Sequence, residues 1–219
     1  MPNHVITRIK AKGIGSLPIY SEDKDEYGCT YMYFDFSKII PMPKDIDPDR
    51  PVNAAHIKNA IRALEIEMDM NNDFRVLTEE AQRMLEAAKD EIMRKMGIDE
   101  NGYKELLEEA LVHAKNIVRH GATTWYDWSI KNWGTKWNSY SNDIHEDEIT
   151  FQTAWCFPEP VILELVKKYP DMEFDIAWAD EDTGCNTGKA VGKNGNLTIR
   201  YLENDSDEAI ELAESLWGR

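Results

Sequence analysis

Residues 149–179 read ITFQTAWCFPEPVILELVKKYPDMEFDIAWA, and this stretch decides the fold. Its first part, 149–156, alternates apolar and polar side chains, which is typical of a half-buried strand. Pro160 then stands where the first turn of a helix tolerates proline, and apolar residues recur at helical spacing up to Pro170. Residues 172–179 alternate again. The stretch therefore predicts a strand, a helix and a second strand in series.

The flanking sequence predicts further strands. Alternating or aromatic, β-prone residues occupy 4–11, 30–36 and 197–201. Asp205, with Glu208 three residues later, forms a capping box for a final helix over 206–217. The acidic stretches 21–27 and 143–148 are predicted to be loops, and the glycine-rich stretch 183–195 a hairpin or loop.

Between these strands the apolar period becomes helical. Helices are predicted over 53–70, 79–96 and 103–120, with Thr78 as an N-cap and Gly97 past the end of the second helix. We therefore divide the chain into N-terminal strands (1–50), a three-helix insertion (51–121) and a C-terminal α+β part (122–219). This order predicts the α+β class, a ferredoxin-like, mainly antiparallel sheet with helices on one face and an α-helical insertion.

The chain is strongly acidic, with 41 acidic and 25 basic residues among 219 and a formal net charge of −16. Residues 143–182 hold 12 of the acidic and only 2 of the basic residues. Such a surface repels nucleic-acid phosphates and attracts basic partners, so direct nucleic-acid binding is disfavoured. Candidate partner-binding residues are Asp171, Glu173, Asp175, Asp180, Glu181 and Asp182. The alternative interpretation is that these acids form a solvated face that keeps the protein soluble.

The segment 123–140 reads TTWYDWSIKNWGTKWNSY and holds four of the seven tryptophans. The indoles would form an adhesive core between helices and sheet. Alternatively, they would line a pocket for a ligand such as a nucleotide. In that case the candidate ligand-binding residues are Trp133, Thr135, Lys136, Trp137 and Asn138.

These motifs also carry a family resemblance. Trp125-Tyr126-Asp127-Trp128, Asn132 to Asn138, the opening MPNHV, Phe34-Asp35-Phe36 and Phe151-Gln152-Thr153-Ala154-Trp155 together resemble the YubB-like family of phages, plasmids and other mobile elements. The resemblance implies a C-terminal ferredoxin-like domain and a mobile-element source. It implies no shared activity, so it assigns no catalytic residue.

The sequence offers little support for catalysis and leaves it open. The five histidines are scattered, and we identify no catalytic residue, no metal ligand set and no cofactor. Cys29, Cys156 and Cys185 lack the spacing of a disulfide framework or zinc site, and Cys156 is predicted to be a small buried residue. No apolar run approaches the ~20 residues of a membrane helix, and no signal peptide is visible. We therefore expect a cytoplasmic location in a bacterial host and no membrane partner.

Three functional hypotheses follow. The first is an acidic accessory protein of a mobile element that binds a host protein and occludes its basic nucleic-acid-binding site, acting against host defence. The second is a small-ligand-binding or enzymatic domain that uses residues 125–138. The third is a structural or regulatory protein with no host target. The sequence leaves the oligomeric state undetermined.

Overall fold

A computed structural model describes residues 3–71 and 78–219. The chain forms two compact units. The sheet unit comprises Met1–Met42 and Trp128–Arg219, and the helical unit comprises Pro43–Asp127. The sequence placed the helical insertion at 51–121. The helical unit therefore also takes in the proline-rich segment before the first helix and the start of the tryptophan-rich segment.

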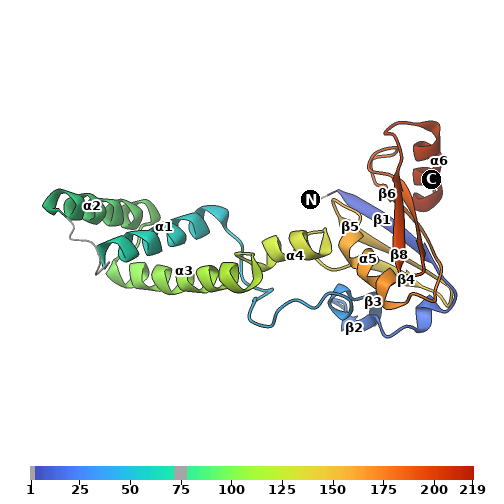
Figure 1. The fold of residues 1–219 in the computed structure, drawn as a ribbon, viewed down its shortest axis with the longest axis horizontal. Coiled ribbons are helices and arrows are strands. Elements are labelled where there is room, and N and C mark those ends of the chain that lie inside the picture. The colour runs from blue at the N-terminus through green and yellow to red at the C-terminus, as the bar shows by residue number, and fades with distance from the viewer. Residues whose placement is uncertain (1–2, 72–77) are drawn as a thin grey trace. The chain divides into compact units, whose positions relative to one another are not determined.

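The sheet unit is built on six antiparallel strands in the order β4-β5-β1-β6-β7-β8 (Figure 1). These strands are β1 (His4–Lys10), β4 (Tyr140–Ile144), β5 (Glu148–Ala154), β6 (Phe174–Asp180), β7 (Gly188–Lys193) and β8 (Asn196–Tyr201). Both β5 and β6 are antiparallel to β1, so they are parallel to each other with β1 between them. The helix α5 (Glu159–Lys168) connects them in the chain. This is the split β-α-β arrangement that the sequence predicts.

The main core lies on the face of the sheet towards α5. Thr7 stands opposite Phe151 on one neighbouring strand and Trp178 on the other, and all three are fully buried. Val5 and Ile9 share this face because side chains alternate along a strand. The apolar residues of α5 cover it, and Val166 reaches Gly192 of β7.

The α+β class and the mainly antiparallel sheet are confirmed, with one difference in the placing of the helices. The helix α6 (Asp207–Trp217) packs its Ala213 against Ile6 and Ala179. Ile6 alternates with Val5 and Thr7, so α6 lies on the face opposite α5. The two helices therefore do not cover one face, because β1 and β6 carry small or apolar residues on both sides.

Two predicted acidic loops contain strands. Residues 21–27 were predicted to be a loop, but β2 (Tyr20–Lys24) pairs with β3 (Thr30–Phe34) in a separate two-stranded sheet. The turn η2 (Phe36–Lys38) follows, and η1 (Ile14–Ser16) precedes β2. In the second predicted loop, β4 runs to Ile144 as an edge strand of the main sheet.

The helical unit contains α1 (Ala54–Met70), α2 (Glu79–Met96) and α3 (Glu100–His120), which lie side by side in Figure 1. The predicted caps are present: the Thr78 hydroxyl accepts a hydrogen bond from the Ala81 N–H, and Gly97 adopts a φ of 66°. The three helices share a small apolar core around Tyr103 and Ile66. Another helix, α4 (Trp125–Trp133), follows. No helix of the described residues is long and apolar enough to cross a membrane.

A close approach between β7 and the buried indole of Trp178 makes Gly188 essential to the sheet. A Cβ at Gly188 would lie 2.1 Å from the Trp178 ring, which is fully buried and stacked on Phe157 with 4.1 Å between ring centroids. We therefore expect Gly188→Ala to lower the free energy of unfolding by about 1–3 kcal/mol, measured by denaturant titration. Val191→Ala, at an exposed position of the same strand, is the control. Equal stabilities of the two variants would contradict this packing.

Candidate functional site

Two of the residues predicted to bind a ligand are core residues. The Trp133 side chain is 5% exposed, and its indole N–H donates to the carbonyl of Ile40 at 2.9 Å. Thr135 is 2% exposed, and its hydroxyl donates to the carbonyl of Ala154 at 2.8 Å. Their polar atoms are used inside the sheet unit, so neither residue faces a ligand site in this structure.

The third predicted ligand-binding residue, Asn138, has a structural role in the sheet unit. Its side-chain oxygen accepts hydrogen bonds from the N–H groups of Phe36 and Ser139, both at 2.9 Å. Its amide nitrogen donates to the carboxylate of Asp35 at 2.8 Å. The amide therefore joins the residues that follow β3 to the segment before β4, and both its oxygen and its nitrogen take part in that contact.

The remaining two predicted residues, Lys136 and Trp137, lie on the surface with a third residue that the sequence did not single out. The Lys136 Nζ lies 4.3 Å from the ring centroid of Trp137 and 5.4 Å from that of Trp155. Both indoles are more than a third exposed. We call Lys136, Trp137 and Trp155 the aromatic cluster. Its ring faces and its ammonium group suit a flat ligand with negative charge.

The backbone at Trp155 is held in an unusual conformation. Its φ is 68°, in the left-handed region that bulky residues rarely adopt. The Trp155 N–H donates to the carbonyl of Asn3 at 2.9 Å, and its carbonyl accepts from the side chain of Asn186 at 3.0 Å. These two bonds offset a conformation that costs about 1–3 kcal/mol, and the indole is left half-exposed as a result.

The six candidate acidic residues are divided between the two ends of β6. Asp180 is 6% exposed and accepts a hydrogen bond from the side chain of Asn3, which also donates to Asp182. Glu181 accepts from the N–H of His4. These three acids hold the start of β1 in place. A seven-residue strand spans about 20 Å, so they share no patch with Asp171, Glu173 and Asp175.

The strand register instead brings a different acidic group together. Lys10 pairs in register with Glu148 of β5 and Asp175 of β6, so the β4–β5 turn and the start of β6 lie at the same end of the sheet. We call this group the acidic edge. It consists of Asp143, Glu146, Asp147, Glu148, Asp171, Glu173 and Asp175. A shallow depression of about 460 Å³ beside Lys10 and Lys12 is lined by Asp147, Glu148 and Glu173 from both sides.

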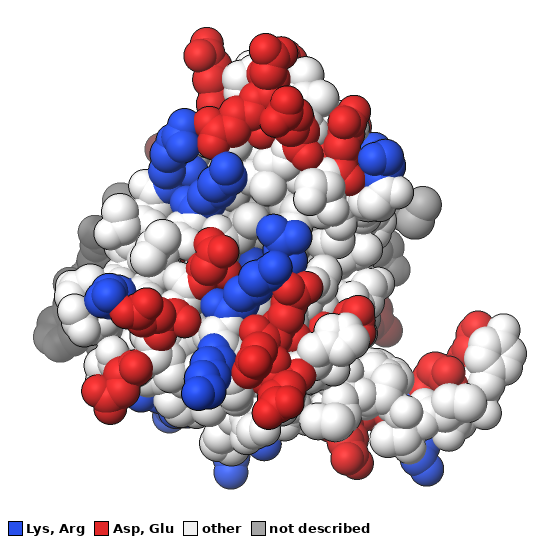
Figure 2. Space-filling model, turned by 90° about the vertical axis from the view of Figure 1, so that its right-hand side faces the viewer, with Lys and Arg blue, Asp and Glu red and all other residues white. Residues whose placement is uncertain are grey.

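Part of the acidic edge is neutralised within the chain. Lys10 pairs with Glu148 at 3.2 Å, Lys193 pairs with Glu173, and Asp147 accepts from the N–H of Gly13. Within the described residues, the side chains of Glu146, Asp171 and Asp175 have no hydrogen bond or ion pair, and these three acids are exposed. The face shown in Figure 2 likewise carries acidic groups with basic side chains between them rather than one continuous acidic field.

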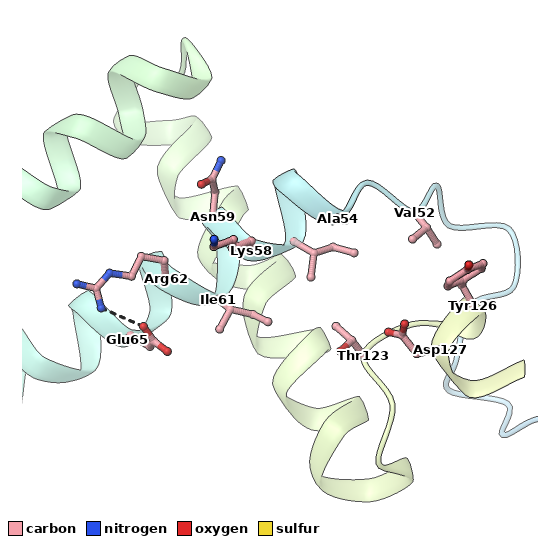
Figure 3. A pocket seen from close by; sticks show the side chains of 11 residues that line it. Val52, Ala54, Lys58, Asn59, Ile61, Arg62, Glu65, Thr123, Tyr126 and Asp127 are labelled. Atoms are coloured by element: carbon pink, nitrogen blue, oxygen red, sulfur yellow. Dashed lines mark hydrogen bonds and ion pairs between the residues drawn. The ribbon is translucent and has the colours of Figure 1, made fainter. Parts of the chain in front are cut away.

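The helical unit contains a separate open groove of about 530 Å³ (Figure 3). Apolar side chains of one face of α1, including Ile57 and Ile61, form its floor. Val52 and Thr123 line it from the connecting segments, and Tyr126 lines it from the start of α4. Lys58 and the Arg62–Glu65 ion pair (3.0 Å) stand at its rim. The size is that of a ligand pocket. The groove was not predicted from the sequence, because its lining comes from two stretches, 52–65 and 123–127, that are far apart in the chain.

The structure corrects the prediction for one cysteine. Cys156, expected to be buried, is exposed, as is Cys29, and all three cysteines are free. Partial burial, followed by the field of Asp180, nevertheless raises the pKa of the Cys156 thiol, so it is a weak nucleophile. Among residues 3–71 and 78–219, no three His, Cys, Asp or Glu side chains are arranged to hold a metal ion.

The fold defines an α+β protein whose sheet unit carries a ferredoxin-like arrangement. In agreement, residues 133–218 match the family model described as the ferredoxin-like domain in Api92-like protein. The match begins at Trp133, the last residue of α4, and ends within one residue of the chain's end. It covers β4 to β8 with α5 and α6.

Among solved structures, the chain is similar to a protein Api92 from Yersinia pseudotuberculosis, with 10% sequence identity and a TM-score of 0.35. That similarity covers 93% of this chain and 99% of the other. A search of curated proteins found no match.

The contacts of Asn138 predict that its side chain stabilises the fold, unlike the side chain of Lys136. We expect Asn138→Ala to lower the free energy of unfolding by about 1–3 kcal/mol, because it leaves the Phe36 N–H without its acceptor and removes one of the hydrogen bonds to the Asp35 carboxylate. Lys136→Ala removes an exposed cation–π contact and should cost about 1 kcal/mol or less. Thermal and denaturant unfolding measure both variants. An Asn138→Ala variant as stable as Lys136→Ala would contradict the structural role of Asn138.

Proposed function

We propose that this protein is an acidic accessory protein of a phage, plasmid or other mobile element, and that its acidic edge binds a basic, nucleic-acid-binding surface of a host protein in the bacterial cytoplasm. By covering that surface it would inhibit a host defence protein. The mobile-element source rests on the YubB-like resemblance. The observation that carries the binding role is the convergence of two acidic stretches, 143–148 and 171–175, at one end of the sheet.

The chemistry of the acidic edge favours a protein partner over nucleic acid. Glu146, Asp171 and Asp175 are exposed carboxylates that water solvates well at no cost to the fold. A basic partner would gain from their summed field during encounter, whereas a phosphate backbone would be repelled. Such an interface is sensitive to salt, because exposed charges are screened over about 8–10 Å at physiological ionic strength.

Charge reversal at the acidic edge tests this proposal. The tagged protein is incubated with nuclease-treated bacterial lysate, and the affinity for any captured basic protein is then measured at about 0.1 M salt. We expect the triple variant Glu146→Lys, Asp171→Lys and Asp175→Lys to bind at least about tenfold more weakly, since each lost charge pair weakens attraction.

The control carries the same change of charge elsewhere. Glu203, Glu211 and Glu214 are exposed, so reversing them to lysine alters the net charge equally without touching the acidic edge. This control should bind nearly as well as the original protein. Equal weakening by both triple variants, or binding that salt does not affect, would exclude the acidic edge as the partner surface.

A second function is favoured by the aromatic cluster. Two half-exposed indoles on either side of an ammonium group suit a planar anionic ligand such as a nucleotide. We expect a nucleotide, with ATP and AMP as probes, to raise the Tm of the protein. Trp155→Ala and Lys136→Ala should abolish that rise, whereas Trp137→Phe should keep most of it. No rise with either probe would remove this candidate.

A further inference from the structure

A small cavity in the helical unit contains an unsatisfied buried donor. The cavity measures about 90 Å³ and lies between the segment before α1, the C-terminal half of α3 and the start of α4. Its polar lining consists of Asp45, Asp47, Arg50, His113, Asn116, Thr123 and Thr124, and Ile46, Val112 and Trp125 complete the lining. At about 30 Å³ per water molecule, it is large enough for a few waters or for one small ion.

Arg50 is the unusual member of this lining. Its Nη1 is buried, and within the described residues it has no hydrogen-bond partner. No ion pair or hydrogen bond of the Arg50 guanidinium is present in that part of the chain either. The Arg50 backbone is fixed, because its carbonyl accepts the indole N–H of Trp125 at 2.9 Å. A buried charged donor without an acceptor is destabilising, so an acceptor from outside the chain is expected.

Two nearby carboxylates are already occupied. Asp45 accepts from His120 at 2.8 Å and from Arg119 at 3.1 Å. These bonds, the one from His120 first, lower the pKa of the Asp45 carboxyl. Asp47 accepts from the N–H of Asp49 at 3.0 Å. Neither carboxylate is bonded to Arg50, although both line the same cavity.

The third nearby carboxylate, Glu109, is shared by two histidines. Its oxygens contact His56 Nε2 at 2.7 Å and His113 Nε2 at 3.4 Å. Partial burial raises the pKa of Glu109, but the hydrogen bond and field of His56, the bond from His113 and the field of Arg50 outweigh it, and the net pKa is lowered. Glu109 is therefore ionised near neutral pH, yet it too leaves the Arg50 guanidinium without a hydrogen bond.

We infer that this cavity is a binding site for a small oxyanion, a carboxylate or phosphate group, which accepts hydrogen bonds from the guanidinium of Arg50. Arginine presents a planar fork of N–H donors that matches the oxygens of both groups. The side chains of His113 and Asn116, which also line the cavity, are held in place because both contact the carbonyl of Thr123 at 3.2 Å. The site is independent of the acidic edge, whose partner must have the opposite charge.

Binding of simple anions to the whole chain tests this inference. Inorganic phosphate and acetate are each titrated against sodium chloride at matched ionic strength. At tenfold excess over Kd, we expect either anion to raise the Tm of the helical unit by about 3–8 °C beyond the chloride effect. Phosphate acting at lower concentration than acetate would identify a phosphate headgroup, and the reverse order a carboxylate.

Substitutions link any such effect to Arg50. Arg50→Met keeps the apolar stem and should abolish the shift, and Arg50→Lys should weaken at least fivefold the affinity for phosphate. Lys58→Met, which removes an exposed cation at the neighbouring groove, is the matched control and should keep the shift. Loss of the Tm shift in the control as well, or no Tm shift with either anion, would overturn the inference. The cavity would then be a water-filled one.

A second measurement avoids the risk that Arg50→Met does not fold. Arginine side-chain N–H resonances of the unmodified protein can be followed by NMR during the phosphate titration. One guanidinium should shift with a saturable dependence on phosphate, and Arg50→Lys assigns it. Linear drifts of all arginine resonances together would show only ionic strength, and would also overturn the inference.

Discussion

The position of β1 at the centre of the sheet is the constraint on which the sheet unit depends. The strand formed by His4–Lys10 is hydrogen-bonded on one side to Glu148–Ala154 and on the other to Phe174–Asp180. Its partners therefore lie more than 130 residues away in sequence. Closing such long loops costs entropy that only a buried, fully paired strand can offset. Asp180 and Asp182 accept hydrogen bonds from Asn3, the residue before the strand, so the acids at that end stabilise the closure.

The sequence predicted most of the elements that bury an apolar face, although not α4, and it missed β2 and β4, which bury little. The strand–helix–strand stretch over 149–179 and the three helices show clear periods, because each element places one face in a core. β2 and β4 read YSEDK and YSNDI, and most of their side chains are exposed or half-exposed. An edge strand or hairpin needs backbone pairing more than burial, so its residues carry little periodic signal.

Composition likewise cannot distinguish a buried indole from an exposed one. Trp133 and Trp137 lie four residues apart, yet one is 5% and the other 37% exposed. Trp133 follows the helical turn of α4 into the core, and Gly134, with a φ of 78°, then redirects the chain. Trp155 joins Trp137 only through the fold, because β5 ends beside the segment that follows α4. A prediction from residue type alone therefore included three structural residues and omitted one exposed indole.

Exposed and buried charges differ in how well water solvates them. An exposed excess of carboxylates is well solvated, so a net charge of −16 is compatible with either a partner surface or simple solubility. The buried Nη1 of Arg50 has no such solvation, so this one donor points to a binding site more strongly than the acidic excess does. The two sites should also respond differently to salt. Screening weakens attraction at the exposed edge over a Debye length, whereas it acts less on a buried donor.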